Sequence, residues 1–336
     1  MLSKVVQSNK ITEYIMAEKT KSIIIGAIVI GISASLWGFD GVFLTPQLYN
    51  LDVTFVVFIL HFIPFTLMNI FLYKKYEHLK SLDIQELLSL VFISLFGAVI
   101  GTLAIVKALF LINFQSLSIV ILLQKLQPLF AIFLAVTFLK ETLRKRYIFW
   151  AVIALTAGYF MTFGVNKIDF DLGNDTFRAS LYALLAAFSF GSSTVFGKKV
   201  MGKLDFATAT FFRYGIATII MLVIVIYNRS YLGFYEATPQ NWVVISVISV
   251  TTGSGSMMLY YYGLKRVKAI IATIMELFFP ISAVIFDYVI NGNILSNIQI
   301  ISAIVMIFAI VNLNTDNVRA IMKLKVILKN AKNKIE

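Results

Sequence analysis

Ten runs of about 20 predominantly apolar residues constrain the fold of this chain more than any other feature. A helix of that length crosses about 30 Å of hydrocarbon. The mean hydropathy is +0.87 and only 14% of the residues are charged, values far outside the range of soluble globular domains. Because the runs also lack the strict alternation of outer-membrane barrel strands, the sequence predicts an all-α integral membrane protein. The ten predicted transmembrane helices lie at residues 23–45, 53–73, 87–110, 116–139, 147–165, 179–197, 206–227, 241–263, 269–290 and 297–314.

Basic residues are distributed unevenly between the loops. Most of the 29 Lys and Arg residues lie before the first run, in the C-terminal tail, or in the loops after the second, fourth, sixth and eighth runs. The intervening loops hold only Lys167, Arg178 and Arg229. By the positive-inside rule, this pattern predicts that both termini are cytoplasmic in an inner (plasma) membrane. The net charge of +12 therefore reflects orientation, and we expect the lipid bilayer, not nucleic acid, as the macromolecular partner.

The chain contains an internal repeat. A shift of 153 residues superposes residues 34–43 on 187–196 and Asp52 on Asp205. Because each copy holds five runs, the second copy must enter the bilayer from the opposite side, and the distribution of basic loops inverts accordingly. We therefore expect two inverted five-helix repeats, a construction typical of secondary transporters. The predicted segments are a cytoplasmic N-terminal segment at 1–22, repeat one at 23–165, an external linker at 166–178, repeat two at 179–314 and a basic amphipathic cytoplasmic tail at 315–336.

Short motifs accompany the repeat. The pair Trp37-Gly38 lies in the first run, and the stretch LQKLQPLFAIFLAVTFLKETL at 123–143 places Pro128 within the fourth run and Glu141 at its end. Together with the repeat, these motifs resemble those of the EamA-type carriers of the drug/metabolite transporter (DMT) superfamily. The resemblance covers nearly the whole membrane part of the chain. It implies a ten-span inner-membrane carrier that moves small organic solutes, such as amino acids, by alternating access.

Ionisable and polar side chains lie within several of the apolar runs. An ionisable group at bilayer depth costs at least about 2.5 kcal/mol unless it has a partner or faces a wet cavity, so these residues mark the predicted substrate site. We expect a substrate carboxylate to meet Lys125 or Arg213. A substrate ammonium group would meet Glu276 or Asp40, so the site suits a zwitterion. The predicted substrate-binding residues are Trp37, Asp40, His61, Gln124, Lys125, Arg213, Tyr214, Tyr260 and Glu276.

Several of these residues also have a structural interpretation. Arg213 and Glu276 can form an ion pair between two spans. His61 can pack between helices instead of carrying a proton. Tyr261, near the cytoplasmic end of its run, can belong to the interfacial aromatic belt.

Two prolines interrupt the apolar runs at equivalent positions, because a shift of 152 residues superposes Pro128 on Pro280. Each removes a backbone donor and frees carbonyl groups in the turn before it, near Gln124 and Glu276. We expect kinked helices that shape a cavity there, and an inert kink is the alternative.

These observations favour a secondary carrier that exports amino acids or related metabolites, with a proton as the candidate coupling ion. Direct ATP use is not supported, because no GxxxxGK[ST] run occurs. The alternative is an uptake carrier for a quaternary amine such as choline, favoured if Trp37, Asp40 and Glu276 converge. A membrane-embedded enzyme or flippase subunit is a remoter alternative, since the chain has 2 His, no Cys and no metal-spaced cluster. We therefore expect no catalytic residue, no metal site and no cofactor, in a monomer or a homodimer.

Overall fold

A computed structural model gives the fold of residues 2–111, 123–124, 126–143, 145–163, 174–292, 294 and 296–312. Every regular element in these residues is a helix, as predicted, and η denotes short π- or 3₁₀-helical turns. The elements are α1 (Leu2–Phe39), η1 (Asp40–Leu44), η2 (Thr45–Leu48), α2 (Val53–Leu72), η3 (Tyr73–Ser81), α3 (Ile84–Ser94), η4 (Leu95–Ile100), α4 (Gly101–Leu111), α6 (Gln127–Leu139), α7 (Lys145–Phe163), α8 (Asn174–Val200), α9 (Phe206–Asn228), η5 (Ser230–Leu232), α10 (Gly233–Glu236), α11 (Pro239–Ile248), η6 (Ser249–Gly253), α12 (Ser254–Arg266), α13 (Ala269–Met275), α14 (Phe278–Asn291) and an apolar helix, Asn297–Asn312.

Seven helical stretches of the described residues are long and apolar enough to cross a membrane. They coincide with the first three and the sixth to ninth predicted runs. The three other runs contain α6, α7 and the Asn297–Asn312 helix. The helical membrane fold is confirmed. The count of ten spans stays a prediction, because residues 116–122 and 125 of the fourth run lie outside the described residues.

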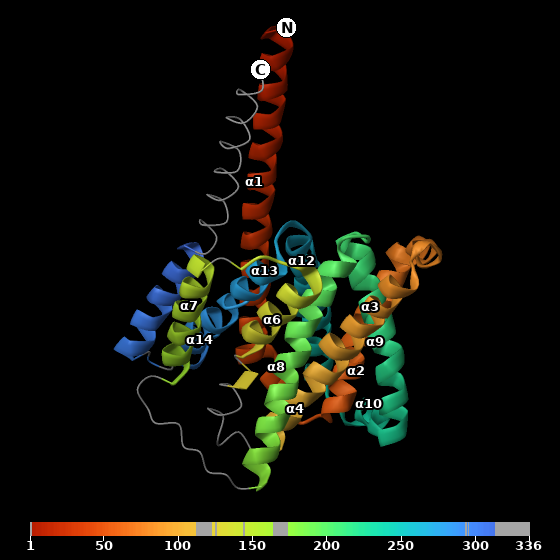
Figure 1. The fold of residues 1–336 in the computed structure, drawn as a ribbon. Coiled ribbons are helices and arrows are strands. Elements are labelled where there is room, and N and C mark those ends of the chain that lie inside the picture. The colour runs from red at the N-terminus through yellow and green to blue at the C-terminus, as the bar shows by residue number, and fades with distance from the viewer. Residues whose placement is uncertain are drawn as a thin grey trace.

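The two ends of the helical bundle carry different connections. The N-terminal part of α1 emerges from one end (Figure 1). We call this end the N-terminal face, and it carries the connections at 73–83, 140–143 and 201–205. The opposite face carries the connections at 45–52 and 229–238.

The two halves of the chain interlock. α1 packs against α12 and α14, whereas α8 packs against α3, α4 and α6. The first span of each half therefore contacts the third and fourth spans of the other half. The second spans, α2 and α9, pack against each other. A two-fold relation between the halves would produce this reciprocal pattern.

Equivalent glycines permit close helix contacts in both halves. A Cβ atom on Gly38 would lie 2.7 Å from the carbonyl oxygen of Phe279 in α14. A Cβ atom on Gly191 would lie 2.9 Å from the carbonyl oxygen of Gln127 in α6. A shift of 153 residues relates the two glycines, and a shift of 152 relates their partners. The contact of α1 with α14 is thus repeated in the contact of α8 with α6.

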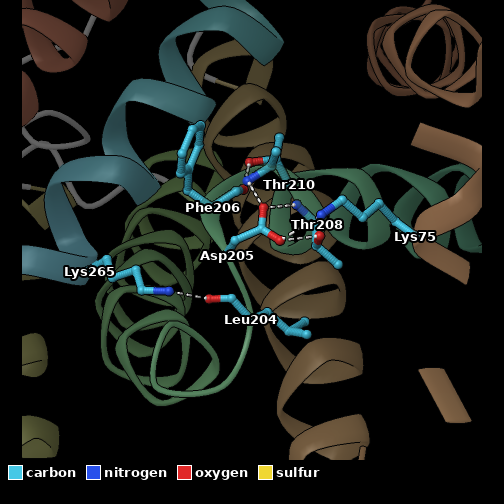
Figure 2. Close-up of polar contacts among 8 residues, drawn as sticks. Lys75, Leu204, Asp205, Phe206, Thr208, Thr210 and Lys265 are labelled. Atoms are coloured by element: carbon cyan, nitrogen blue, oxygen red, sulfur yellow. Dashed lines mark hydrogen bonds and ion pairs between the residues drawn. The ribbon is translucent and has the colours of Figure 1, made fainter. Parts of the chain in front are cut away.

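Two aspartates cap the second spans of the halves. Asp52 accepts a hydrogen bond from the backbone N–H of Phe55 at the start of α2. Asp205 accepts hydrogen bonds from two backbone N–H groups at the start of α9 (Figure 2). Burial raises the pKa of Asp205, but hydrogen bonds from Thr208 and from Lys75 outweigh this effect and hold the pKa at about 2. The Asp205 carboxylate is therefore ionised at neutral pH.

The fourth spans are interrupted shortly before their prolines. α6 begins at Gln127 and α14 begins at Phe278, so Pro128 and Pro280 lie in the first turn of a new helix. The missing N–H of proline costs little there, because the first turn has no intrahelical acceptor for it. Pro280 is preceded by a non-helical turn at Glu276. The predicted kinks are thus helix breaks, and one of them presents Glu276 to the neighbouring helices.

Glu141 connects the two halves at the N-terminal face. Its carboxylate oxygens accept hydrogen bonds from the backbone nitrogens of Ala269 (2.9 Å) and Ile270 (3.1 Å), the first residues of α13. The hydroxyl of Tyr147 donates to the carbonyl oxygen of Ile270 at 2.5 Å. Because α13 has no side-chain cap of its own, Glu141 supplies the acceptors and the negative charge that a helix N-terminus requires.

Replacing Gly38 by alanine should lower the melting temperature of the folded protein. The added methyl group would lie 2.7 Å from the α14 backbone, so the two helices must separate, at a cost of about 1–3 kcal/mol. Gly41→Ala is the matched control, because the nearest atom to a Cβ there lies 3.9 Å away. Thermal denaturation of both variants in the same detergent tests this expectation, and equal melting temperatures would contradict the close contact.

Candidate functional site

Glu276 lies at the interruption between α13 and α14 and is surrounded by hydrogen-bond donors. The hydroxyl of Tyr260 donates to Oε1 at 2.6 Å, and the hydroxyl of Thr194 donates to the same oxygen at 3.2 Å. The side-chain amide of Gln127 donates to Oε2. These partners come from α12, α8 and α6, so helices of both halves meet at one carboxylate. We call Gln127, Thr194, Tyr260 and Glu276 the Glu276 cluster.

An aromatic wall lies beside the Glu276 cluster. The rings of Trp37 and Tyr260 have their centroids 5.4 Å apart and are inclined by 48°. Tyr260 is only 4% exposed, whereas Trp37 is partly exposed. Since Tyr260 also donates to Glu276, the structure joins Trp37, Tyr260 and Glu276 in one site. All three are among the predicted substrate-binding residues.

Arg213 is held by two side chains of its own. Its Nη1 donates to Ser193 Oγ at 2.9 Å and to the Tyr261 hydroxyl at 2.8 Å. The guanidinium carbon also lies 5.8 Å from the centroid of the Tyr261 ring. Tyr261 is fully buried, so its assignment to the interfacial aromatic belt is wrong.

Arg213 and Glu276 do not form the ion pair that their similar depth suggested. Ion pairs among the described residues join Lys75 to Asp205 and Lys203 to Glu86. Arg213 contacts Ser193 and Tyr261, whereas Glu276 contacts Thr194 and Tyr260. Adjacent residues of α8 and of α12 thus bind the two side chains separately.

His61 and Tyr214, equivalent by the shift of 153 residues, lie together between α2 and α9. Their ring centroids are 5.1 Å apart. The carbonyl oxygen of Val57 lies 2.7 Å from His61 Nδ1. Because a carbonyl only accepts, this contact assigns the proton to Nδ1. The geometry is that of a helix-packing histidine, and the structure does not join it to the Glu276 cluster by a hydrogen bond among the described residues.

The remaining predicted site residues are not part of the cluster. Asp40, the first residue of η1, accepts a hydrogen bond from Thr45 at 2.9 Å. Gln124 is partly buried, and no hydrogen bond links it to Glu276 in the described part of the chain. Lys125 lies outside the described residues.

Sequence reasoning did not select four residues that contact Glu276 or Arg213: Gln127, Ser193, Thr194 and Tyr261. A signal was present for three of them. Gln127 lies in the same polar interruption of an apolar run as Gln124, and residues 191–194 read GSST within an apolar run. Neither pattern identifies a partner, because Ser and Thr in helices commonly bond their own backbone.

The site has the composition of a binding site for an organic solute. It combines aromatic faces with a few fixed donors and acceptors, as ligand sites generally do. The described residues contain no group of three or more His, Cys, Asp or Glu side chains that could hold a metal ion. Hydrogen bonding and stacking are therefore the chemistry that the cluster offers.

Comparison with known proteins identifies relatives of the chain. Residues 24–163 and 177–315 match the EamA-like transporter family. The chain is 49% identical over 293 residues to "Riboflavin transporter ImpX" of Fusobacterium nucleatum subsp. nucleatum (strain ATCC 23726 / VPI 4351), a match that covers 87% of this chain and 98% of that protein. A solved crystal structure aligns with a TM-score of 0.65 and 16% identity over 88% of this chain and 98% of that one, which shows a shared fold.

The family match covers both halves of the chain, and it confirms the resemblance to EamA-type carriers of the DMT superfamily. The match to a curated transporter over nearly its whole length agrees with it. The chain therefore belongs to the EamA-like transporter family and is a multi-pass membrane transporter of a small molecule, not an enzyme.

Proposed function

We propose that this chain transports riboflavin or a closely related flavin across the membrane. A flavin has a planar aromatic ring system, a ring edge of carbonyl acceptors around an N–H donor, and a polyol side chain, with no net charge at neutral pH. The site places the rings of Trp37 and Tyr260 beside the carboxylate of Glu276 and the amide of Gln127. Such a molecule needs this combination of flat apolar faces and mixed donors and acceptors. That arrangement carries the proposal, and the relative named as a riboflavin transporter supports it.

An amino acid, the substrate expected from the sequence, fits the site less well. Of the two cations predicted to bind its carboxylate, Lys125 lies outside the described residues. The other, Arg213, already donates to Ser193 and Tyr261 and is only 6% exposed. A substrate would have to displace both partners and desolvate its own carboxylate. Amino acid export is therefore the less favoured hypothesis.

A quaternary amine is the second candidate. Trp37 and Tyr260 beside the Glu276 carboxylate would attract a cation through their ring faces and through charge. Asp40 accepts a hydrogen bond from Thr45, and no hydrogen bond among the described residues joins it to the Glu276 cluster, so the expected convergence of two carboxylates lacks support. One carboxylate and two rings favour a cation less than the predicted pair of carboxylates would, so the flavin hypothesis is preferred.

We also propose that the halves are inverted repeats and that the N-terminal face is cytoplasmic. The repeat is supported by the reciprocal helix packing, by the glycine contacts of Gly38 and Gly191, and by the family match to each half. The orientation is supported by the basic residues of the connections at 73–83 and 201–205. Transport would then proceed by alternating access around the Glu276 cluster, where helices of both halves meet.

Protein reconstituted in liposomes loaded with unlabelled riboflavin should accumulate external radiolabelled riboflavin by counterflow. Excess external riboflavin should abolish the signal, whereas choline and a mixture of zwitterionic amino acids should leave it unchanged. The proposal fails if riboflavin gives no more uptake than empty liposomes. Counterflow of choline in the parallel experiment would select the quaternary amine instead.

Trp37→Leu and Glu276→Gln should each weaken riboflavin binding by about tenfold or more, because one removes a stacking surface and the other a charged acceptor. Quenching of flavin fluorescence by the purified protein measures the affinity. Trp150→Leu is the matched control, since Trp150 of α7 packs edge to face against Phe308 and contacts no residue of the Glu276 cluster among the described interactions. Equal affinities for the Trp37 and Trp150 variants would contradict the placement of the site, and a melting curve for each variant excludes unfolding.

The chain has no cysteine, so single cysteines report the orientation directly. Cysteines replacing the exposed residues Glu77 on the N-terminal face and Tyr235 on the opposite face are to be labelled in intact cells with a membrane-impermeant thiol reagent. We expect labelling at 235 and none at 77 until the cells are permeabilised. The reverse pattern would overturn the orientation.

A further inference from the structure

Two residues at the start of the third spans have the same local role. In α3, the backbone N–H of Asp83 donates to Glu86 Oε2 at 3.0 Å, and that of Glu86 donates back to Asp83. In α11, the backbone N–H of Thr238 donates to Asn241 Oδ1 at 3.0 Å, and that of Asn241 donates back to Thr238. Both pairs are capping boxes. Glu86 and Asn241 therefore occupy the same capping position, the third residue of the helix, at opposite faces of the bundle.

Each of these residues also binds the other half of the chain. Lys203 Nζ lies 3.0 Å from Glu86 Oε1, the oxygen that the capping box leaves free. The side-chain amides of Asn50 and Asn241 exchange two hydrogen bonds, each of 3.1 Å. The shift of 153 residues superposes Asn50 on Lys203. In both cases, a residue of the connection between the first and second spans binds the start of the third span of the opposite half.

We propose that these two pairs are the gates of the transporter: Lys203–Glu86 closes the N-terminal face, and Asn50–Asn241 closes the opposite face. The assignment rests on the proposed alternating access around the Glu276 cluster. Both pairs are formed in this structure, so both ends are held together. Opening one end requires that its own pair separates while the other pair persists.

Neighbouring contacts fix the connection that carries Lys203. Lys75 of the first half lies 3.1 Å from Asp205 Oδ2, and Lys265 Nζ donates to the carbonyl oxygen of Leu204 at 3.1 Å (Figure 2). Lys203, Leu204 and Asp205 are consecutive residues. A rigid connection of this kind transmits the separation of Lys203 from Glu86 to the helices on either side of it, α8 and α9.

The two gates differ in chemistry although their positions are equivalent. The Lys203 side chain is 66% exposed and the Glu86 side chain 11%, and the hydrogen bond and charge of Glu86 raise the pKa of Lys203. An exposed ion pair weakens as salt screens it. Asn241, by contrast, is 3% exposed and uncharged. Salt should therefore loosen the gate at the N-terminal face and leave the amide gate unchanged.

Spin-label distance measurements on the full chain test the assignment, since the absence of native cysteines allows specific labelling. One label pair replaces the exposed residues Glu77 and Lys268 on the N-terminal face, and another replaces Phe43 and Tyr235 towards the opposite face. Lys203→Met should enlarge the long-distance population of the first label pair about two- to fivefold. It should not lengthen the second. Lys199→Met, which removes a neighbouring exposed charge, is the control and should change neither.

A variant of the Asn50–Asn241 gate should change the distance at the opposite face and leave the distance at the N-terminal face unchanged. Asn50→Val spares the capping box and should enlarge only the long-distance population of the labels at 43 and 235, by about two- to fivefold. The two hydrogen bonds between the amides are lost, whereas the bond from the Asn241 amide to the carbonyl oxygen of Gln47 (3.0 Å) remains. Salt near 1 M, where the Debye length is about 3 Å, should act like Lys203→Met in the unaltered protein. The double variant Asn50→Lys with Asn241→Glu should transfer this salt sensitivity to the opposite face.

Variants that change both distances together, or neither, while their melting temperatures stay native would overturn the gates. The distances are measured without substrate, so they do not depend on flavin as the cargo. Riboflavin counterflow that persists alongside unresponsive distances would leave the proposed function intact and remove only the gate assignment. If the distances respond as expected but the protein does not transport flavin, the gate assignment stands and the proposed substrate is wrong.

Discussion

A carboxylate buried among membrane-spanning helices must be surrounded by hydrogen-bond donors, and Glu276 imposes this requirement on the centre of the bundle. Its donors come from α6, α8 and α12. Arg213 is bound by Ser193 of α8 and Tyr261 of α12, which are adjacent in sequence to Thr194 and Tyr260. A rotation of α8 or α12 about its axis would therefore remove one hydrogen-bond partner from each of the two buried side chains at once. The aromatic wall inherits its position from this network, because Tyr260 is a member of both.

The same centre depends on how closely the helices approach one another. Lipid gives helices no hydrophobic reason to associate, so small residues and interhelical hydrogen bonds determine where they cross. Gly38 and Gly191 bring a first span against the backbone of a fourth span in both halves. The fourth spans are interrupted beside these crossings, which membrane helices tolerate only where protein covers the exposed backbone groups. Close packing and the polar site are thus consequences of one arrangement.

The sequence predicts the helices and some of the residues at the Glu276 cluster. It does not predict the others, because their contacts depend on how each helix is rotated about its axis. Apolar run length determines a span, and a carboxylate such as Glu276 is conspicuous within such a run. The depth of a residue along a helix does not tell in which direction its side chain points. Arg213 and Glu276 lie at similar depth and therefore look like partners in the sequence. In the structure, each side chain binds other residues of α8 and α12. Thr194 is inconspicuous until the rotation of α8 is known. The partner of Glu141 lies 128 residues away in sequence, where no local pattern indicates it.

The family matches both halves of the chain, but the groups at the centre of the bundle differ between the halves. The shift of 152 residues places Gln124 where the second half has Glu276, and the shift of 153 places Phe190 where the first half has Trp37. The carboxylate therefore comes from one half and the partly exposed indole of Trp37 from the other. A symmetric site would accept a substrate in two opposite orientations. The asymmetric cluster presents different groups on its two sides, which suits the proposed flavin, a molecule with a flat ring system at one end and a polyol at the other.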